Sequence, residues 1–115
     1  MPSAASRFQV VLVTCPTRAV ARRIASQLIS RRLAACVNLV PGIESIYRWQ
    51  GKVERAREVL LVIKGTASGF ERLKRAILAL HPYDVPEVIG LPILAGHSPY
   101  LRWLSQSTAP AKISP

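Results

Sequence analysis

Two long β-forming segments that meet at residues 50–51 constrain the fold of this chain more than any other feature. Residues 35–50 predict one long strand, in which the Pro-Gly pair at 41–42 marks a bulge or kink because proline cannot donate to a ladder. Residues 53–64 predict the partner strand. The Gln-Gly pair at 50–51 suits a tight hairpin turn, since its glycine supplies a positive φ. We therefore expect a hairpin with unusually long strands.

The segments on either side of this hairpin predict two more strands and two helices. Residues 8–15 are short and β-branched, as in a buried strand, and residues 87–94 predict the fourth strand. Between residues 19 and 33 the apolar positions recur at spacings of three and four, which predicts a helix with one wide buried face. Residues 70–80 carry a narrower apolar stripe at the same period and predict the second helix.

Local signals indicate where the later helices begin and end. Ser68 and Glu71 have the spacing of a capping box at the start of the second helix, and the His-Pro pair at 81–82 ends that helix. Residues 98–104 predict a short C-terminal helix capped by its Ser-Pro pair. Residues 108–115 are expected to form a frayed tail.

The resulting order is β-α-β-β-α-β followed by a helix. This order predicts an α+β fold of the ferredoxin-like type, with two helices on one face of an antiparallel sheet. The 115 residues suit a single domain, with an ordered core of about residues 8–107.

The predicted hairpin is long enough to overhang a four-stranded core, and its exposed strand edges invite pairing with another chain. Tyr47 and Trp49 near its tip offer the apolar area that an interface uses. The alternative is that both aromatic side chains fold back onto their own sheet. A mean hydropathy of +0.23 favours the interface.

The net charge of +10, from 16 Lys and Arg against 6 Asp and Glu, fits either an anionic partner or a solvated basic surface. The basic residues are dispersed, with no run longer than two, so a nucleic-acid partner is not expected. A cation site in such a chain needs a local anionic pocket.

His81, with Asp84 and Glu87 close by, is the best candidate for a site and offers donors for a divalent cation. Two features favour a structural role instead. Pro82 and Pro86 break the helix, so the three side chains need not share a face. A histidine at a helix C-terminus also interacts favourably with the helix dipole.

Cys15 follows a strand and precedes a helix, where a reactive thiolate would need His81 or His97 as its base. Cys36 lies in an apolar run and is expected in the core. The two cysteines are expected at opposite ends of the sheet, so we predict no disulfide and a reducing cytoplasm. No signal peptide, membrane span, phosphate loop or catalytic triad is recognisable, and we do not expect an enzyme.

Several motifs in order resemble the CutA divalent-cation tolerance family over residues 8–104. They are residues 33–38 (LAACVN), 45–52 (SIYRWQGK), 58–64 (EVLLVIK), 81–87 (HPYDVPE) and 100–104 (YLRWL). The resemblance implies a fold similar to the PII signalling proteins, a tight homotrimer assembled through strands of neighbouring subunits, and a link to tolerance of copper and other divalent cations.

The resemblance also implies a metal ion, copper or zinc, or a small ligand in clefts between subunits. The residues expected there are His81, Asp84 and Glu87, with Tyr47, Trp49, Tyr83 and Trp103 at the cleft or interface. Some members of the family look like copper-binding proteins. Their copper ligands would be a cysteine in the first strand and a pair of histidines directly before a Pro-Tyr pair. This chain has Val13 and Leu80-His81 there, so only His81 matches, and Cys15 is a weak substitute. The alternative is a non-enzymatic trimeric scaffold or signalling module that binds an anionic ligand or partner protein.

Overall fold

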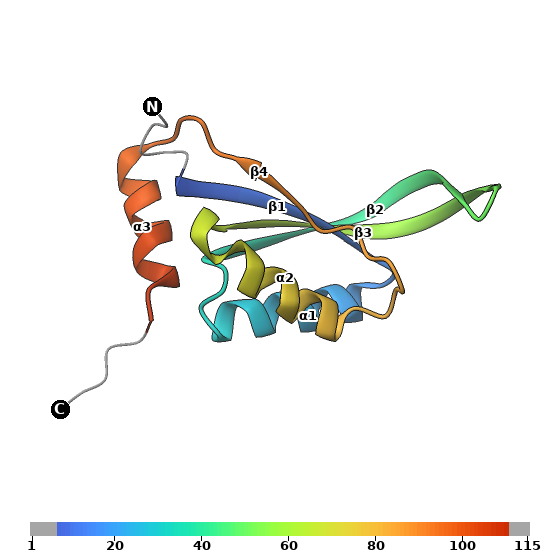
Figure 1. Cartoon of the computed structure of the whole chain (residues 1–115), viewed down its shortest axis with the longest axis horizontal. Helices are drawn as coiled ribbons and strands as arrows, with labels where there is room; N and C mark the ends of the chain where they lie inside the picture. The colour runs from blue at the N-terminus through green and yellow to red at the C-terminus, as the bar shows by residue number, and fades with distance from the viewer. Residues whose placement is uncertain (1–6, 111–115) are drawn as a thin grey trace.

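The computed structural model describes residues 7–110, so residues 1–6 and 111–115, including most of the predicted tail, lie outside the described part. Figure 1 shows the arrangement of the elements. They are β1 (Phe8–Cys15), α1 (Arg18–Ser30), β2 (Cys36–Trp49), β3 (Lys52–Thr66), a 3-10 turn η2 (Ala67–Gly69), α2 (Phe70–Leu80), β4 (Ile89–Pro92) and α3 (Ser98–Thr108).

The four strands form one sheet in the order β2-β3-β1-β4, and every neighbouring pair is antiparallel. The predicted ferredoxin-like α+β fold is confirmed. β1 pairs with β3 along its whole length, from Phe8 opposite Thr66 to Cys15 opposite Val59. β4 pairs with β1 only at residues 9–12, so it is a short edge strand.

The β2–β3 hairpin continues well past the end of β1. Its register shifts between Val40 and Ile43, where Gly42 has a φ of 73°, which confirms the predicted bulge. Gln50 and Gly51 both have positive φ, as a type I′ hairpin turn requires. Residues 52–58 of β3 therefore project beyond β1 with β2 as their sheet neighbour, a reach of about 24 Å at the usual rise per residue. This projecting arm extends to the right in Figure 1.

The core lies between one face of the sheet and helices α1 and α2. The odd-numbered residues of β1 and β3 face these helices, and the core includes Val11, Val13, Leu61, Ile24 and Ile77. Both helices lie on the same side of the sheet, while α3 packs at the end remote from the hairpin tip (Figure 1). Its Leu104 is fully buried.

Neither α1 nor α2 covers the opposite face of the sheet (Figure 1). Val40, Ile89 and Leu91 point to this side, because their cross-strand partners are even-numbered residues of β3 and β1. Their side chains are 41%, 49% and 47% exposed. We call these three residues and their even-numbered partners the bare face.

α1 ends at Ser30 rather than at residue 33, so the predicted helix was too long. Arg32 adopts a left-handed conformation with a φ of 56°. The Leu33 N–H then donates to the Leu28 carbonyl and the Arg32 N–H to the Ile29 carbonyl. This is a Schellman ending, which stops a helix by satisfying its last carbonyls.

Three other predicted boundaries were wrong. The capping box is absent, because Ser68 lies in η2 and α2 begins at Phe70 without a side-chain cap. Ser98 is the first residue of α3 rather than its cap, and α3 runs on to Thr108. The fourth strand covers Ile89–Pro92 instead of residues 87–94, since the prolines near both ends have no N–H for a ladder.

Arg32→Gly is predicted to stabilise the fold. Glycine adopts the left-handed conformation without the penalty that a side chain pays, so the free energy of unfolding should rise by about 0.5–1 kcal/mol. Arg31→Gly is the matched control, because Arg31 has a φ of −89° and should lose stability when replaced by glycine. Urea denaturation of both variants provides the measurement. A loss of stability in Arg32→Gly would contradict the Schellman assignment.

Candidate functional site

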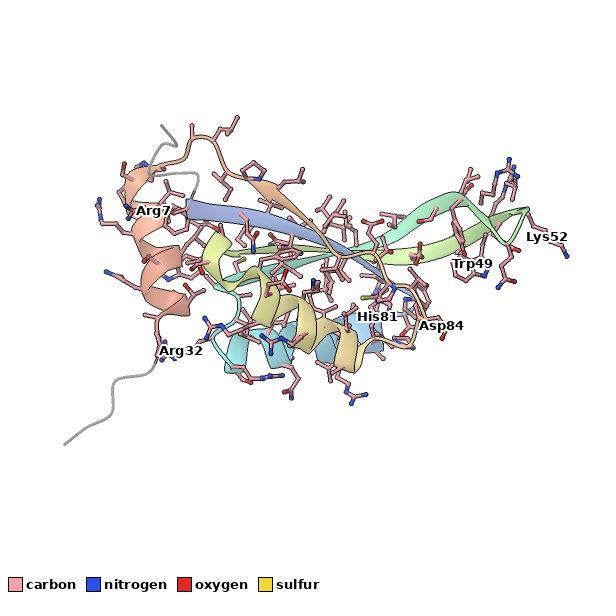
Figure 2. The ribbon with its side chains drawn as sticks, in the orientation of Figure 1. Arg7, Arg32, Trp49, Lys52, His81 and Asp84 are labelled. Carbon is pink, nitrogen blue, oxygen red and sulfur yellow. The ribbon has the colours of Figure 1, made fainter. Side chains whose placement is uncertain are left out.

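A cleft of about 580 Å³ lies at the base of the projecting hairpin. It forms where β1 has ended and the loop of residues 81–88 runs beside the longer strands β2 and β3. We call it the hairpin-base cleft. Its lining residues are Thr14 of β1, Ser45, Ile46, Tyr47 and Trp49 of β2, Glu58 of β3, and Tyr83, Asp84, Val85 and Glu87 of the loop. Figure 2 labels Trp49 on the hairpin and Asp84 on the loop beneath it.

His81 fixes the start of this loop to the end of β1. Its side chain is only 8% exposed. Nε2 lies 2.8 Å from the Thr14 carbonyl oxygen, and the Tyr83 backbone N–H donates to Nδ1 at 3.2 Å. A backbone N–H can only donate, so Nδ1 is the acceptor and we assign the proton to Nε2. Both ring nitrogens are therefore engaged, and a metal could bind His81 only by displacing one of these hydrogen bonds.

Tyr83 ties the loop to the hairpin. Its hydroxyl donates to Glu58 Oε2 at 2.7 Å, and its ring lies against that of His81 with centroids 4.7 Å apart. Burial, followed by the hydrogen bond to Glu58, raises the pKa of the Tyr83 phenol, so the hydroxyl stays protonated and can donate. The Tyr83–Glu58 contact joins segments that are distant in sequence and closes one side of the cleft.

Glu58 was not among the predicted site residues. It is only 6% exposed, and among residues 7–110 its carboxylate receives one hydrogen bond, from the Tyr83 hydroxyl. Within residues 7–110 it has no ion pair. One signal in the sequence was available, because Glu58 directly precedes the continuous apolar run of residues 59–63.

The predicted metal ligands are only partly brought together. Asp84 and Glu87 line the cleft with Glu58, whereas both nitrogens of His81 are occupied by other partners. No three His, Cys, Asp or Glu side chains in the described part of the chain converge as a metal site would require. The cleft nevertheless contains three of the six acidic residues of a +10 chain, and no described lysine or arginine lines it.

The predicted aromatic residues divide between two places. Tyr47 and Trp49 line the cleft and are 44% and 43% exposed, so they are not covered by their own sheet. Trp103 lies on α3 beside Tyr100, with ring centroids 5.5 Å apart, at the end of the molecule away from the cleft (Figure 1). The structure therefore does not bring Trp103 into the cleft.

Cys15 is fully buried in the core, and burial together with nearby Glu58 raises the pKa of its thiol to about 11. A neutral thiol of this kind is a poor nucleophile and a poor metal ligand, which argues against the reactive-thiolate reading. Cys36 is partly buried, and both cysteines are free thiols. They lie opposite Val59 and Lys64 of β3, well separated along the sheet as predicted.

Stability should fall at high pH because of Cys15. The folded protein holds this thiol neutral up to about pH 11, whereas its ordinary pKa of 9.0 lets the unfolded chain ionise earlier. The contribution of the neutral Cys15 thiol to the free energy of unfolding is complete below pH 9. It falls by about 2 kcal/mol as the pH rises towards 11. Urea unfolding of wild type and Cys15→Ala at a series of pH values should show their difference shrinking over this range. Cys36→Ala is the control, and parallel profiles for Cys15→Ala and wild type would contradict the assignment.

Within residues 7–110, no helix has the length and apolar character needed to cross a bilayer.

Solved structures with this fold have related sequences. A divalent cation tolerance protein from Thermus thermophilus has a TM-score of 0.87 and 53% identity, covering 89% of this chain and 99% of that one. A protein from Archaeoglobus fulgidus, described as a periplasmic divalent cation tolerance protein CutA, has a TM-score of 0.87 and 32% identity over the same shares.

Sequence comparisons agree. A divalent-cation tolerance protein CutA from Thermus thermophilus is 54% identical over 100 residues, 87% of this chain and 97% of that protein. A chloroplastic CutA protein from Arabidopsis thaliana is 52% identical over 86% of this chain, which spans 54% of the plant protein. The sequence model of the CutA1 divalent ion tolerance protein matches residues 9–107. The chain belongs to the CutA1 divalent ion tolerance family.

Proposed function

We propose that this protein is a non-enzymatic homotrimer, similar to the PII proteins, that supports tolerance of divalent cations such as copper. In this proposal it binds a metal ion or a small ligand in the hairpin-base cleft, which lies at a subunit boundary. The observation that carries the proposal is the charge of the cleft. Glu58, Asp84 and Glu87 line it, and no Lys or Arg among residues 7–110 joins them, although the whole chain carries a net charge of +10. A local anionic pocket of this kind attracts cations that the rest of the surface repels.

The homotrimer is supported by surfaces that one chain leaves uncovered. The bare face exposes Val40 on β2 and Ile89 and Leu91 on β4, the two edge strands of the sheet, and neither α1 nor α2 covers them. The projecting hairpin adds the unpaired strand edges of residues 43–49 and 52–58. Apolar side chains beside open strand edges favour a second copy of the same chain, because backbone pairing and apolar burial then occur together.

A metal in the cleft would rely on carboxylate oxygens of Asp84 or Glu87, because the acidic residues of the cleft do not converge as a three-ligand site within residues 7–110. Copper and zinc bind more strongly to imidazole and thiolate ligands, which here belong to His81 and Cys15 and are engaged or protonated. The donor set therefore fits a weakly held, exchangeable cation better than a permanently bound one. Such weak binding suits a protein that responds to cation levels.

The non-enzymatic assignment rests on the same residues. His81 has no ring nitrogen free to act as a base, and the raised pKa of Cys15 keeps that thiol protonated. The free thiols of Cys15 and Cys36 support a reducing compartment, and we propose the cytoplasm.

A second cavity favours the alternative of an anionic ligand. It measures about 740 Å³ and lies where the start of α3 meets the end of β3 and the start of β1. Arg7 and Arg102 line it together with the hydroxyl residues Thr66, Ser68 and Ser98. Guanidinium and hydroxyl groups together suit a phosphate-bearing ligand. Binding of ATP that weakens steeply with salt and is lost in Arg102→Ala would support this alternative.

The bare face can be tested through the oligomeric state. Wild type should have a mass of about 38 kDa by light scattering, three times the 12.6 kDa chain. Leu91→Asp should shift the protein towards monomers, because it buries a charge in the interface. Leu78→Asp is the matched control, since Leu78 on α2 is 46% exposed and Leu91 is 47% exposed. A monomeric wild type, or equal effects of the two variants, would remove the trimer from the proposal.

The cleft can be tested by calorimetric titration with Cu(II) and Zn(II). The double variant Asp84→Asn, Glu87→Gln should bind at least about tenfold more weakly, since each lost charged contact is worth roughly 1 kcal/mol or more. Glu71→Gln is the control, because Glu71 pairs with Lys74 on the surface of α2 and does not line the cleft. Unchanged isotherms in the double variant would show that the metal binds elsewhere.

A further inference from the structure

The hairpin-base cleft combines an uncompensated buried carboxylate with exposed aromatic faces. Glu58 is 94% buried, given its 6% exposure, and the structure provides it with one neutral hydrogen-bond donor and no ion pair within residues 7–110. A buried charge without a cationic partner is costly. A positively charged ligand that approaches Glu58 would therefore be attracted strongly, because the surroundings screen the interaction less than water does.

Three aromatic side chains from two separate segments line the same cleft. Tyr47 and Trp49 lie on β2, and Tyr83 lies on the loop that faces the hairpin. Tyr47 and Trp49 share the sheet face of Glu58, because their cross-strand partners Glu54 and Lys52 lie at even-numbered positions of β3. The faces of Tyr and Trp rings attract cations through their quadrupoles, most strongly when water is excluded.

The size of the cleft selects the kind of cation. About 580 Å³ is the volume of a small-molecule site and far exceeds what one metal ion fills. The acidic residues do not converge with other donors as a metal requires, and His81 is saturated by Thr14 and Tyr83. Val85 and Ile46 add apolar walls that suit methyl or methylene groups.

We propose that the hairpin-base cleft binds an organic cation, a quaternary ammonium or an alkylated amine, with its charged centre against the aromatic rings and its charge balanced by Glu58. Asp84 and Glu87 attract the ligand at the mouth. This inference names the ligand class of the cleft that the proposed function rests on, and it concerns an organic ligand in place of a bare metal ion.

The test compares choline with 3,3-dimethyl-1-butanol, its uncharged analogue of nearly the same shape, by calorimetry on the wild-type protein. Choline should bind at least about tenfold more tightly, since only it gains the cation–π and carboxylate attraction. Because this comparison uses unmodified protein, it does not depend on whether a variant folds. Equal binding of both compounds, or no binding of either, would overturn the proposal.

Variants then assign the site. Trp49→Leu keeps an apolar side chain but removes the ring, and should weaken choline about 3- to 30-fold while leaving the neutral analogue unchanged. Trp103→Leu is the matched control, because both tryptophans are 43% exposed but Trp103 lies away from the cleft. Glu58→Gln should also weaken choline selectively. Equal losses in Trp49→Leu and Trp103→Leu would show that choline does not occupy this cleft.

The outcome is separable from that of the proposed function. Metal binding that depends on Asp84 and Glu87, without choline binding, would overturn this inference and leave the divalent-cation proposal standing. Choline binding to a protein that proves monomeric would support the inference and remove the trimer.

Discussion

The difference in length between β1 and β3 determines where everything else in this structure lies. β1 ends at Cys15, where Pro16 cannot continue the ladder, while β3 continues through residues 52–58 with β2 as its sheet partner. The sheet therefore has a step where β1 ends. Before the step it has four strands, packed against helices α1 and α2, and beyond the step only the two-stranded arm of β2 and β3 continues (Figure 1). Glu58 is the first residue of β3 beyond the end of β1, so a carboxylate lies at the step. The bulge at Gly42 falls opposite the same region and bends β2 there.

The loop of residues 81–88 turns this step into an enclosed cleft. His81 attaches the loop to the Thr14 carbonyl near the end of β1, and Tyr83 attaches it to Glu58. Both ring nitrogens of His81 thus hold the loop in place. The groups that remain to contact a ligand are the carboxylates and aromatic rings that line the cleft. Within residues 7–110, Glu58 has a hydrogen bond from Tyr83 and no counter-ion. In a chain with so much positive charge, this local reversal of sign is what makes the cleft a candidate for cations.

Much of the fold could be predicted from the sequence because its determinants are local. Gly51 indicated the hairpin turn and Gly42 the bulge. The order of elements followed from short β-branched runs, which predict strands, and from apolar spacings of three and four, which predict helices. The errors came from features that local patterns do not encode. The end of α1 depends on the left-handed conformation of Arg32, which a residue with a side chain rarely adopts. Ser68 lies in the 3-10 turn η2 that precedes α2, so it does not cap that helix. The site was harder still, because the burial of Glu58 and the saturation of His81 arise from contacts between residues 25 and 67 positions apart.

The central claim is that the step in the sheet creates a cleft that selects positive charge. Crystals of the protein soaked in trimethylselenonium would test it most directly, because the selenium of this small organic cation can be located by its anomalous scattering. The account predicts an anomalous peak inside the hairpin-base cleft, in contact with the rings of Tyr47, Trp49 or Tyr83 and on the side of Glu58. A cleft that stays empty of selenium, or that is filled by side chains of a neighbouring subunit, would contradict it.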